Sequence, residues 1–124
     1  MVDGSARERE LVNLLYDRQF AVMRAPASGS ASDHELPDAI AGRDGTVYVF
    51  EAKSSAEKPI YVEGVEIRAL RKFGRGFDAK VRVAARFNYH EWAFFEPNQL
   101  HVTPGGNYRV KKEDIPNGET LEDL

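Results

Sequence analysis

Residues 37–53 read Pro-Asp-Ala-Ile-Ala-Gly-Arg-Asp-Gly-Thr-Val-Tyr-Val-Phe-Glu-Ala-Lys, and this stretch decides the fold. Its middle, Gly-Arg-Asp-Gly at 42–45, has the composition of a hairpin turn between two apolar runs. We therefore expect adjacent strands at 37–41 and 46–53. The second strand begins apolar and ends charged, so its end should emerge from the core.

Two carboxylates and a lysine are expected to meet at that emerging end. The hairpin would bring Asp38 level with Glu51, and strand alternation puts Glu51 and Lys53 on one face. Two clustered carboxylates repel each other unless a cation or a proton lies between them. Mg²⁺ prefers oxygen ligands and keeps several waters, so the set predicts a magnesium site, with Mn²⁺ as a substitute. The alternative is a solvated strand end, because an isolated pattern of this kind recurs by chance.

The rest of the chain predicts an α/β domain. A helix is expected over 5–19, with Ser5 as its N-cap, and a second over 62–77. Further strands are expected at 20–24, 81–86 and 91–95, which gives a mixed five-stranded β-sheet flanked by helices. The segment 100–110 is expected to be irregular. The acidic residues 113–124 are expected to form a loosely held tail of the single domain 1–124.

The first helix supplies a further acid. On a helical wheel, Glu8 falls at the centre of the apolar face with Leu11 and Leu15, whereas Glu10 falls on the opposite face and should be solvated. A buried carboxylate needs a partner. That partner is either the N-terminus of the helix itself, with Glu8 as capping-box acid, or the metal site. The helix alone leaves both open.

Composition narrows the class of protein. The chain has 124 residues, no Cys and a net charge of −3. No apolar run reaches membrane-spanning length and no leader is evident, so we expect a cytoplasmic protein with no membrane partner. The second helix nevertheless carries a basic series that could face nucleic acid or form an ordinary solvated face: Arg68, Arg71, Lys72 and Arg75. Tyr61 at its entry could contact DNA or simply pack.

These motifs in this order resemble the archaeal Holliday junction resolvases, a branch of the PD-(D/E)xK nuclease superfamily. The resemblance begins with Arg7-Glu8-Arg9-Glu10-Leu11 and is most specific over residues 20–30, Phe-Ala-Val-Met-Arg-Ala-Pro-Ala-Ser-Gly-Ser. It continues through Pro37-Asp38 and Glu51-Ala52-Lys53-Ser54 to Ile60-Tyr61-Val62.

The resemblance implies a restriction-endonuclease-like fold and a role for each matching residue. Asp38, Glu51 and the Ala52 carbonyl would bind metal, with Glu8 as a further essential acid near it. Lys53 would orient or activate water, Ser28 would contact the scissile region, and Arg24 and Ser30 would contact DNA. The resemblance also implies a homodimer that cuts opposing strands of four-way junction DNA.

Two other functions remain open: a nuclease of the same superfamily acting on linear or flapped DNA, and a DNA-binding module with a decayed site. Retention of Glu8, Asp38, Glu51 and Lys53 together argues against decay. The net acidity departs from the basic character usual for such resolvases. A halophilic source would explain it, because high salt screens bulk charge.

Overall fold

The computed structural model describes residues 3–26 and 35–124. Its main elements are α1 (Gly4–Asp17), β1 (Ala21–Arg24), β2 (Ala39–Arg43), β3 (Thr46–Ser55), β4 (Ile60–Val62), α2 (Gly64–Gly76), β5 (Lys80–Phe87), β6 (Ala93–Phe95), β7 (His101–Val102) and β8 (Tyr108–Val110). Within these residues, five strands form one sheet in the order β1-β2-β3-β5-β6. The pair β3–β5 is parallel and the other pairs are antiparallel, which confirms the expected mixed sheet.

The hairpin between β2 and β3 is confirmed. Its two turn residues, Asp44 and Gly45, have positive φ angles of 52° and 84°. That conformation matches a two-residue turn whose twist suits the flanking strands. Since Ala39 pairs with Phe50 across the hairpin, Asp38 comes level with the charged end of β3.

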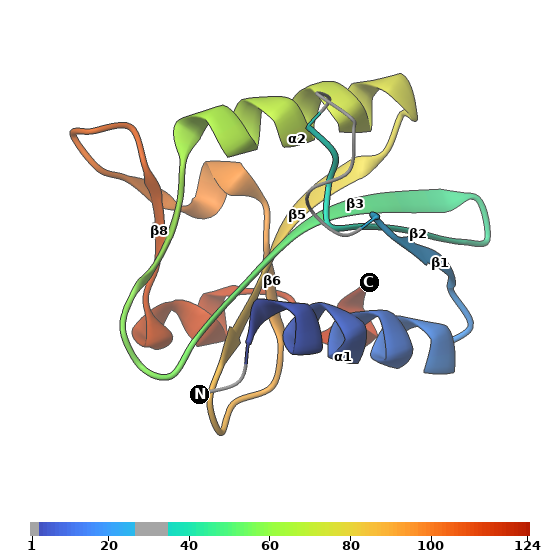
Figure 1. Cartoon of the computed structure of the whole chain (residues 1–124), viewed down its shortest axis with the longest axis horizontal. Helices are drawn as coiled ribbons and strands as arrows, with labels where there is room; N and C mark the ends of the chain where they lie inside the picture. Colours follow the sequence, from blue (N-terminus) through green and yellow to red (C-terminus); the bar gives the residue numbers. More distant parts are fainter. Residues whose placement is uncertain (1–2, 27–34) are drawn as a thin grey trace.

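The two long helices cover opposite faces of this sheet, as Figure 1 shows, with α1 on one side and α2 on the other. Successive side chains of strand β3 point to opposite faces of the sheet. Its Tyr48 and Phe50 lie in a buried cluster with Leu11 and Leu15 of α1. On the other face, α2 approaches closely at Gly74, where a Cβ would come within 2.8 Å of the Val81 side chain. A second buried cluster on the α2 side includes Ile60, Val62, Ile67, Val83 and Phe87.

The first helix begins earlier than expected. Asp3 is the N-cap, and its carboxylate accepts a hydrogen bond from the Ala6 N–H at 2.8 Å. The prediction of Ser5 as N-cap is therefore wrong. Asp is favoured at the N-cap about as strongly as Ser, and Asp3 lies directly before Gly4, the first residue of the helix. The capping-box role considered for Glu8 is lost with it.

The segment expected to be irregular contains strands β7 and β8. Together with β4 they form a three-stranded sheet in the order β4-β8-β7. Each is only two or three residues long, too short for alternation to reveal. This small sheet packs beneath the start of α2 through buried Val62 and Val110.

The acidic C-terminal segment packs against the domain, unlike the expected loosely held tail. Glu119 exchanges two backbone hydrogen bonds with Phe94 of β6, at 2.8 and 2.9 Å. Its side chain also accepts a hydrogen bond from Arg82 at 2.6 Å, and Leu121 is buried in the core on the α1 side. Across the described residues, neither helix has the length and apolar character needed to cross a bilayer.

Candidate active site

Asp38 and Glu51 lie side by side where β2 and β3 meet. The Asp38 N–H donates to the Phe50 carbonyl at 2.9 Å, which holds the Asp38 backbone against β3. The Ala52 N–H in turn donates to Oδ2 of Asp38 at 2.7 Å. The Asp38 carboxylate is thus fixed beside the residue that follows Glu51. The hairpin geometry expected from the sequence brings these two acids together.

Both carboxyl groups have raised pKa values. Burial and then the charge of Asp38 raise the pKa of Glu51 to about 9. Burial raises the pKa of Asp38 as well, aided by the charge of Glu8 and opposed by the Ala52 hydrogen bond. Removal of both protons therefore concentrates negative charge that calls for a nearby cation.

Lys53 lies between two acids on the face of β3 that α2 covers. Its Nζ lies 2.9 Å from Oε2 of Glu66 and 3.8 Å from Oε2 of Glu51. Burial opposes the charge on Lys53, but the hydrogen bond and charge of Glu66, together with the charges of Glu51 and Asp38, raise its pKa. Lys53 is therefore held as an ammonium ion. Sequence reasoning missed Glu66 as a member of this site. The sequence feature that could have identified Glu66 is its position on the same side of the second helix as the apolar residues.

Glu8 reaches the same region from α1. Its Oε1 accepts a hydrogen bond from Nε of Arg24 at 3.1 Å, and Nη2 of Arg24 also donates to the Ser5 hydroxyl at 2.6 Å. The influence of Glu8 on the pKa of Asp38 places it within electrostatic range of the acid pair. Arg24, expected to contact DNA, therefore pairs with an acid of the site in this protein without DNA.

The donor set fits a hard divalent cation bound largely by water. Within residues 3–26 and 35–124, no group of three or more Asp, Glu, His or Cys side chains is arranged to hold a metal ion. However, Mg²⁺ commonly binds through only one or two protein carboxylates and keeps several waters. Asp38 and Glu51, adjacent and mutually repelling, meet that requirement.

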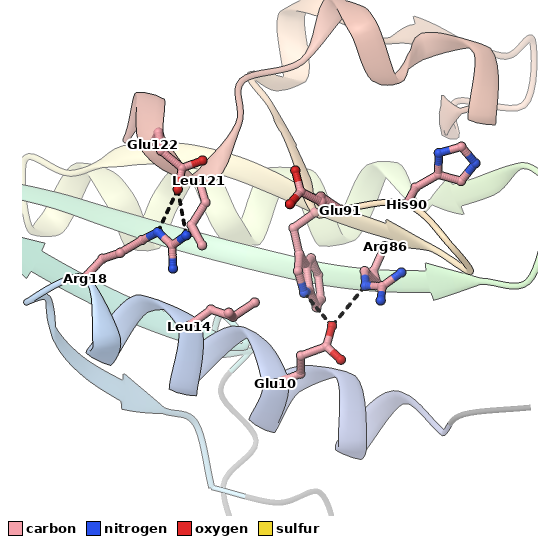
Figure 2. Close-up of a pocket in the computed structure, with 9 residues that line it drawn as sticks. Glu10, Leu14, Arg18, Arg86, His90, Glu91, Leu121 and Glu122 are labelled. Carbon is pink, nitrogen blue, oxygen red and sulfur yellow. Dashed lines mark hydrogen bonds and ion pairs between the residues drawn. The ribbon is translucent and has the colours of Figure 1, made fainter.

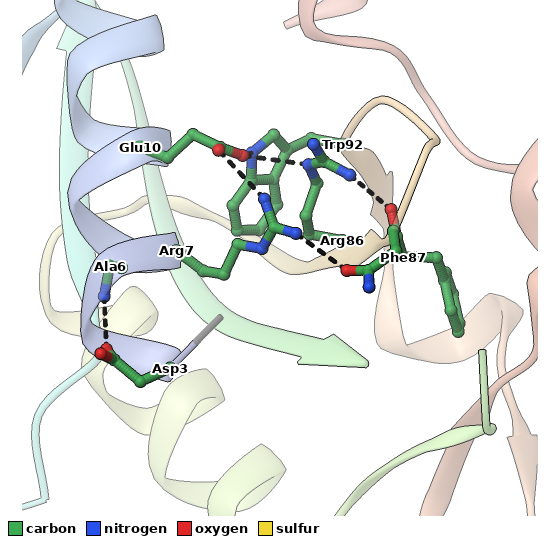
Figure 3. Close-up of polar contacts among 8 residues, drawn as sticks. Asp3, Ala6, Arg7, Glu10, Arg86, Phe87 and Trp92 are labelled. Carbon is green, nitrogen blue, oxygen red and sulfur yellow. Dashed lines mark hydrogen bonds and ion pairs between the residues drawn. The ribbon is translucent and has the colours of Figure 1, made fainter. Parts of the chain in front are cut away.

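The expectation that Glu10 is solvated is wrong. Its Oε1 accepts hydrogen bonds from Nε1 of Trp92 at 2.8 Å and Nε of Arg86 at 3.0 Å, and its Oε2 accepts one from Arg7 at 3.1 Å (Figure 3). The buried stripe of α1 runs through Arg7, Leu11 and Leu15, so Glu8 and Glu10 flank it on opposite sides. The wheel centred the stripe on Glu8 because Arg7 was not expected to be buried.

Glu10 also lines a pocket of about 300 Å³ between α1 and the C-terminal segment (Figure 2). Arg18 and Glu122, which form an ion pair at 2.6 Å, lie at another part of its wall. This pocket mixes two cations with several acids, and none of its lining residues belongs to the acid pair or contacts Lys53.

The basic series on α2 divides into two kinds of residue. Arg68, Lys72 and Arg75 are exposed, as is Tyr61 on β4. Arg71 instead donates to Oδ1 of Asn98 at 2.7 Å and lies over the Tyr108 ring, so it ties α2 to its neighbours. Ser28 and Ser30 lie outside the described residues.

The mixed sheet, with paired carboxylates and a lysine at one end of β3, defines a nuclease of the restriction-endonuclease-like class. More particularly, the chain belongs to the archaeal Holliday junction resolvase (Hjc) family, whose model matches residues 2–124. Membership of this nuclease family is consistent with a divalent metal at the acid pair.

Solved and curated relatives agree with this assignment. The structure of the Holliday junction resolvase Hjc from Archaeoglobus fulgidus matches with a TM-score of 0.88 at 31% identity, covering 97% of this chain and 98% of the other. The crossover junction endodeoxyribonuclease Hjc of Sulfurisphaera tokodaii is 35% identical over 98% of this chain and 84% of its own length. The Methanocaldococcus jannaschii protein of the same name is 39% identical over 86% of this chain and 74% of its own.

Proposed function

We propose that this chain acts as a single nuclease domain that resolves four-way DNA junctions by paired, symmetrical cuts in opposing strands. The observation that carries the proposal is the side-by-side placement of Asp38 and Glu51, with Lys53 3.8 Å from Glu51. Phosphodiester hydrolysis requires a stabilised negative charge at phosphorus, an oriented water and a stabilised leaving oxygen. Oxygen ligands beside an ammonium ion suit that chemistry.

The proposed cofactor is Mg²⁺, with Mn²⁺ able to replace it. Asp38 and Glu51 would hold it with the Ala52 carbonyl, and Glu8 would be the further acid of the set. When bound, the metal would polarise the phosphate, lower the pKa of a bound water and neutralise the leaving oxygen. The two carboxylates must lose their protons to bind it, so metal binding and proton release are coupled.

The remaining site residues would act on DNA. Lys53 would orient or activate the attacking water, and its ammonium charge would stabilise the phosphate. Arg24 would exchange its bonds to Glu8 and Ser5 for a DNA phosphate. Ser28 would contact the scissile region, and Ser30 would contact DNA.

The exposed cations on α2 would follow the phosphate backbone. The three are Arg68, Lys72 and Arg75, and Tyr61 lies on the strand that leads into this helix. Each neutralised phosphate releases counterions and makes affinity depend on salt. Arg71 is a weaker member of this proposed surface, because its guanidinium is already engaged with Asn98 and Tyr108.

We further propose a homodimer, because two active sites related by a twofold axis suit the pseudo-twofold symmetry of a four-way junction. Exposed apolar side chains near the site support a self-association surface: Met23 is 70% exposed, Phe77 54% and Leu36 43%. Met23 and Leu36 line an apolar groove together with Phe73, and the Phe77 ring stacks on that of Phe73. Light scattering should give twice the chain mass, and Phe77→Glu should give the monomer. A monomeric wild type would contradict this part of the proposal.

Substrate selectivity tests the function itself. The protein would be incubated with a four-way junction, a flapped duplex and a linear duplex, each with and without Mg²⁺. Paired symmetrical nicks confined to the junction and dependent on metal are expected. Preferential cutting of flapped or linear DNA would instead support another nuclease activity, and binding without cutting would indicate a DNA-binding module.

A further inference from the structure

Glu66 makes the closest ionic contact of Lys53 in the described part of the chain. Its Oε2 lies 2.9 Å from Nζ of Lys53, whereas Oε2 of Glu51 lies at 3.8 Å. Both side chains of the closer pair are about two-thirds shielded, with exposed fractions of 28% for Glu66 and 32% for Lys53. Partial burial makes this pair less screened than a surface ion pair.

Glu66 is itself fixed from the other side. Its Oε1 accepts a hydrogen bond from the Glu63 N–H at 3.0 Å, in the first turn of α2. That turn is packed tightly, because Ile67 is fully buried and a Cβ at Gly64 would come within 2.8 Å of the Gly106 carbonyl oxygen. The two oxygens of Glu66 therefore join the rigid start of α2 to the lysine of the site.

Lys53 needs such an anchor. Its ammonium ends a flexible four-carbon stem and presents three rotatable donors, so strand position alone does not fix where the charge lies. Glu51 cannot serve both as a metal ligand and as the principal partner of Lys53. Glu66 lies on a separate element, α2, and its Oε2 contacts the Lys53 ammonium more closely than Glu51 does.

We propose that Glu66 is a positioning residue that holds the Lys53 ammonium beside Glu51, in the orientation needed to meet the attacking water and the scissile phosphate. This inference rests on the proposed function and deepens it. It assigns no bond-making step to Glu66, whose proposed role is exerted through Lys53, although its charge also raises the pKa of Glu51. A displacement of about 1 Å of such a group can cost on the order of 10²-fold in rate.

Three variants test the proposal. Glu66→Ala removes both contacts, whereas Glu66→Gln keeps a single acceptor oxygen, which can preserve the contact with Lys53 or the one with the Glu63 N–H, because Glu66 uses a separate oxygen for each. Gln99→Ala is the matched structural control, because Oε1 of Gln99 accepts from the Glu96 N–H at 2.9 Å in the same local arrangement, away from Lys53. For each variant, the single-turnover cleavage rate of a four-way junction, the metal-free junction Kd and the Tm would be measured.

We expect Glu66→Ala to lower the cleavage rate at least about tenfold while the junction Kd changes less than about twofold. Glu66→Gln should recover part of the rate, because it can keep one of the two contacts, and Gln99→Ala should cut like the wild type. A second measurement needs no metal: NMR relaxation of the Lys53 side chain should show greater mobility in Glu66→Ala and an intermediate mobility in Glu66→Gln.

The outcomes separate this inference from the proposed function. If the wild type cuts the junction and Glu66→Ala cuts it equally fast, the positioning role is wrong and the resolvase activity is unaffected. Equal losses of rate and Tm in Glu66→Ala and Gln99→Ala, with Lys53 mobility unchanged, would reduce Glu66 to a helix-capping residue. A wild type that cuts no junction would overturn the proposed function, and this inference with it.

Discussion

The backbone N–H of Ala52 donates a hydrogen bond of 2.7 Å to the carboxylate of Asp38. Fourteen residues separate the two, and the hairpin closes that separation. The bond orients the Asp38 carboxylate beside Glu51. The Ala52 N–H therefore fixes the position of one carboxylate of the acid pair in the metal-free protein.

The acid pair predicts a specific pH dependence of stability. The folded pKa of Glu51 is raised from 4.5 to about 9, so the folded state binds more protons than the unfolded state across that window. Metal-free stability should therefore fall as pH rises through it. Urea unfolding in EDTA at about pH 5.5 and about pH 8 should show this loss in the wild type and a smaller loss in Glu51→Gln. Identical pH slopes for the two proteins would contradict the assignment.

Metal should reverse this effect. On the proposed function, Mg²⁺ would bind the folded protein with both carboxylates ionised, so the Tm gained on adding Mg²⁺ should grow with pH. Thermal unfolding with and without Mg²⁺ at the same two pH values measures that gain. Asp38→Asn should remove most of it, and Glu91→Gln, an exposed acid away from the site, should leave it unchanged. A gain independent of pH in the wild type would argue against binding at this pair.

Glu10 should matter for stability. Glu10→Ala removes the acceptor of the Trp92 N–H and one of the acceptors of Arg7 and of Arg86, at a cost of about 2 kcal/mol in the free energy of unfolding. Glu10→Gln keeps an acceptor and should cost about half as much. Urea unfolding at neutral pH measures both, with Glu91→Gln as the control. Hydrogen bonds from Arg86 and Trp92 outweigh burial and lower the pKa of Glu10, so its contribution should disappear only as pH falls below 4.5. An unchanged free energy of unfolding in Glu10→Ala would show that these hydrogen bonds do not stabilise the fold.

The two kinds of α2 cation should separate experimentally. Arg68→Ala, Lys72→Ala and Arg75→Ala should leave Tm nearly unchanged and should each reduce the salt slope of junction binding by about one. Arg71→Ala should lower Tm instead, because it breaks contacts with Asn98 and Tyr108. Binding titrations at several salt concentrations, together with thermal unfolding, distinguish these outcomes. Equal behaviour of Arg68→Ala and Arg71→Ala would contradict the division.

Sequence reasoning succeeded where the pattern is local. The turn chemistry of Asp44-Gly45 and the alternation along β3 were sufficient to place Asp38 beside Glu51. The same reasoning placed both long helices and the five strands of the main sheet. Each of these features depends on residues close together in the chain.

The features that the sequence did not predict depend on packing between residues far apart in the chain. The roles of Glu10 and Glu119 are set by arginines on β5, and no helical wheel contains that strand. The contact between Glu66 and Lys53 likewise requires the relative placement of α2 and β3. Strands β4, β7 and β8 are too short to leave a periodic signal, so their pairing becomes visible only in the folded chain.

The central claim is that Asp38 and Glu51 together hold the metal that drives junction cleavage. The most direct measurement compares binding and cutting of a four-way junction by the wild type and Glu51→Gln in Mg²⁺. Loss of several kcal/mol of transition-state stabilisation should slow cutting by roughly 10³-fold, while junction affinity stays near that of the wild type. Asp38→Asn should behave in the same way. Cutting by Glu51→Gln at the wild-type rate would contradict the account.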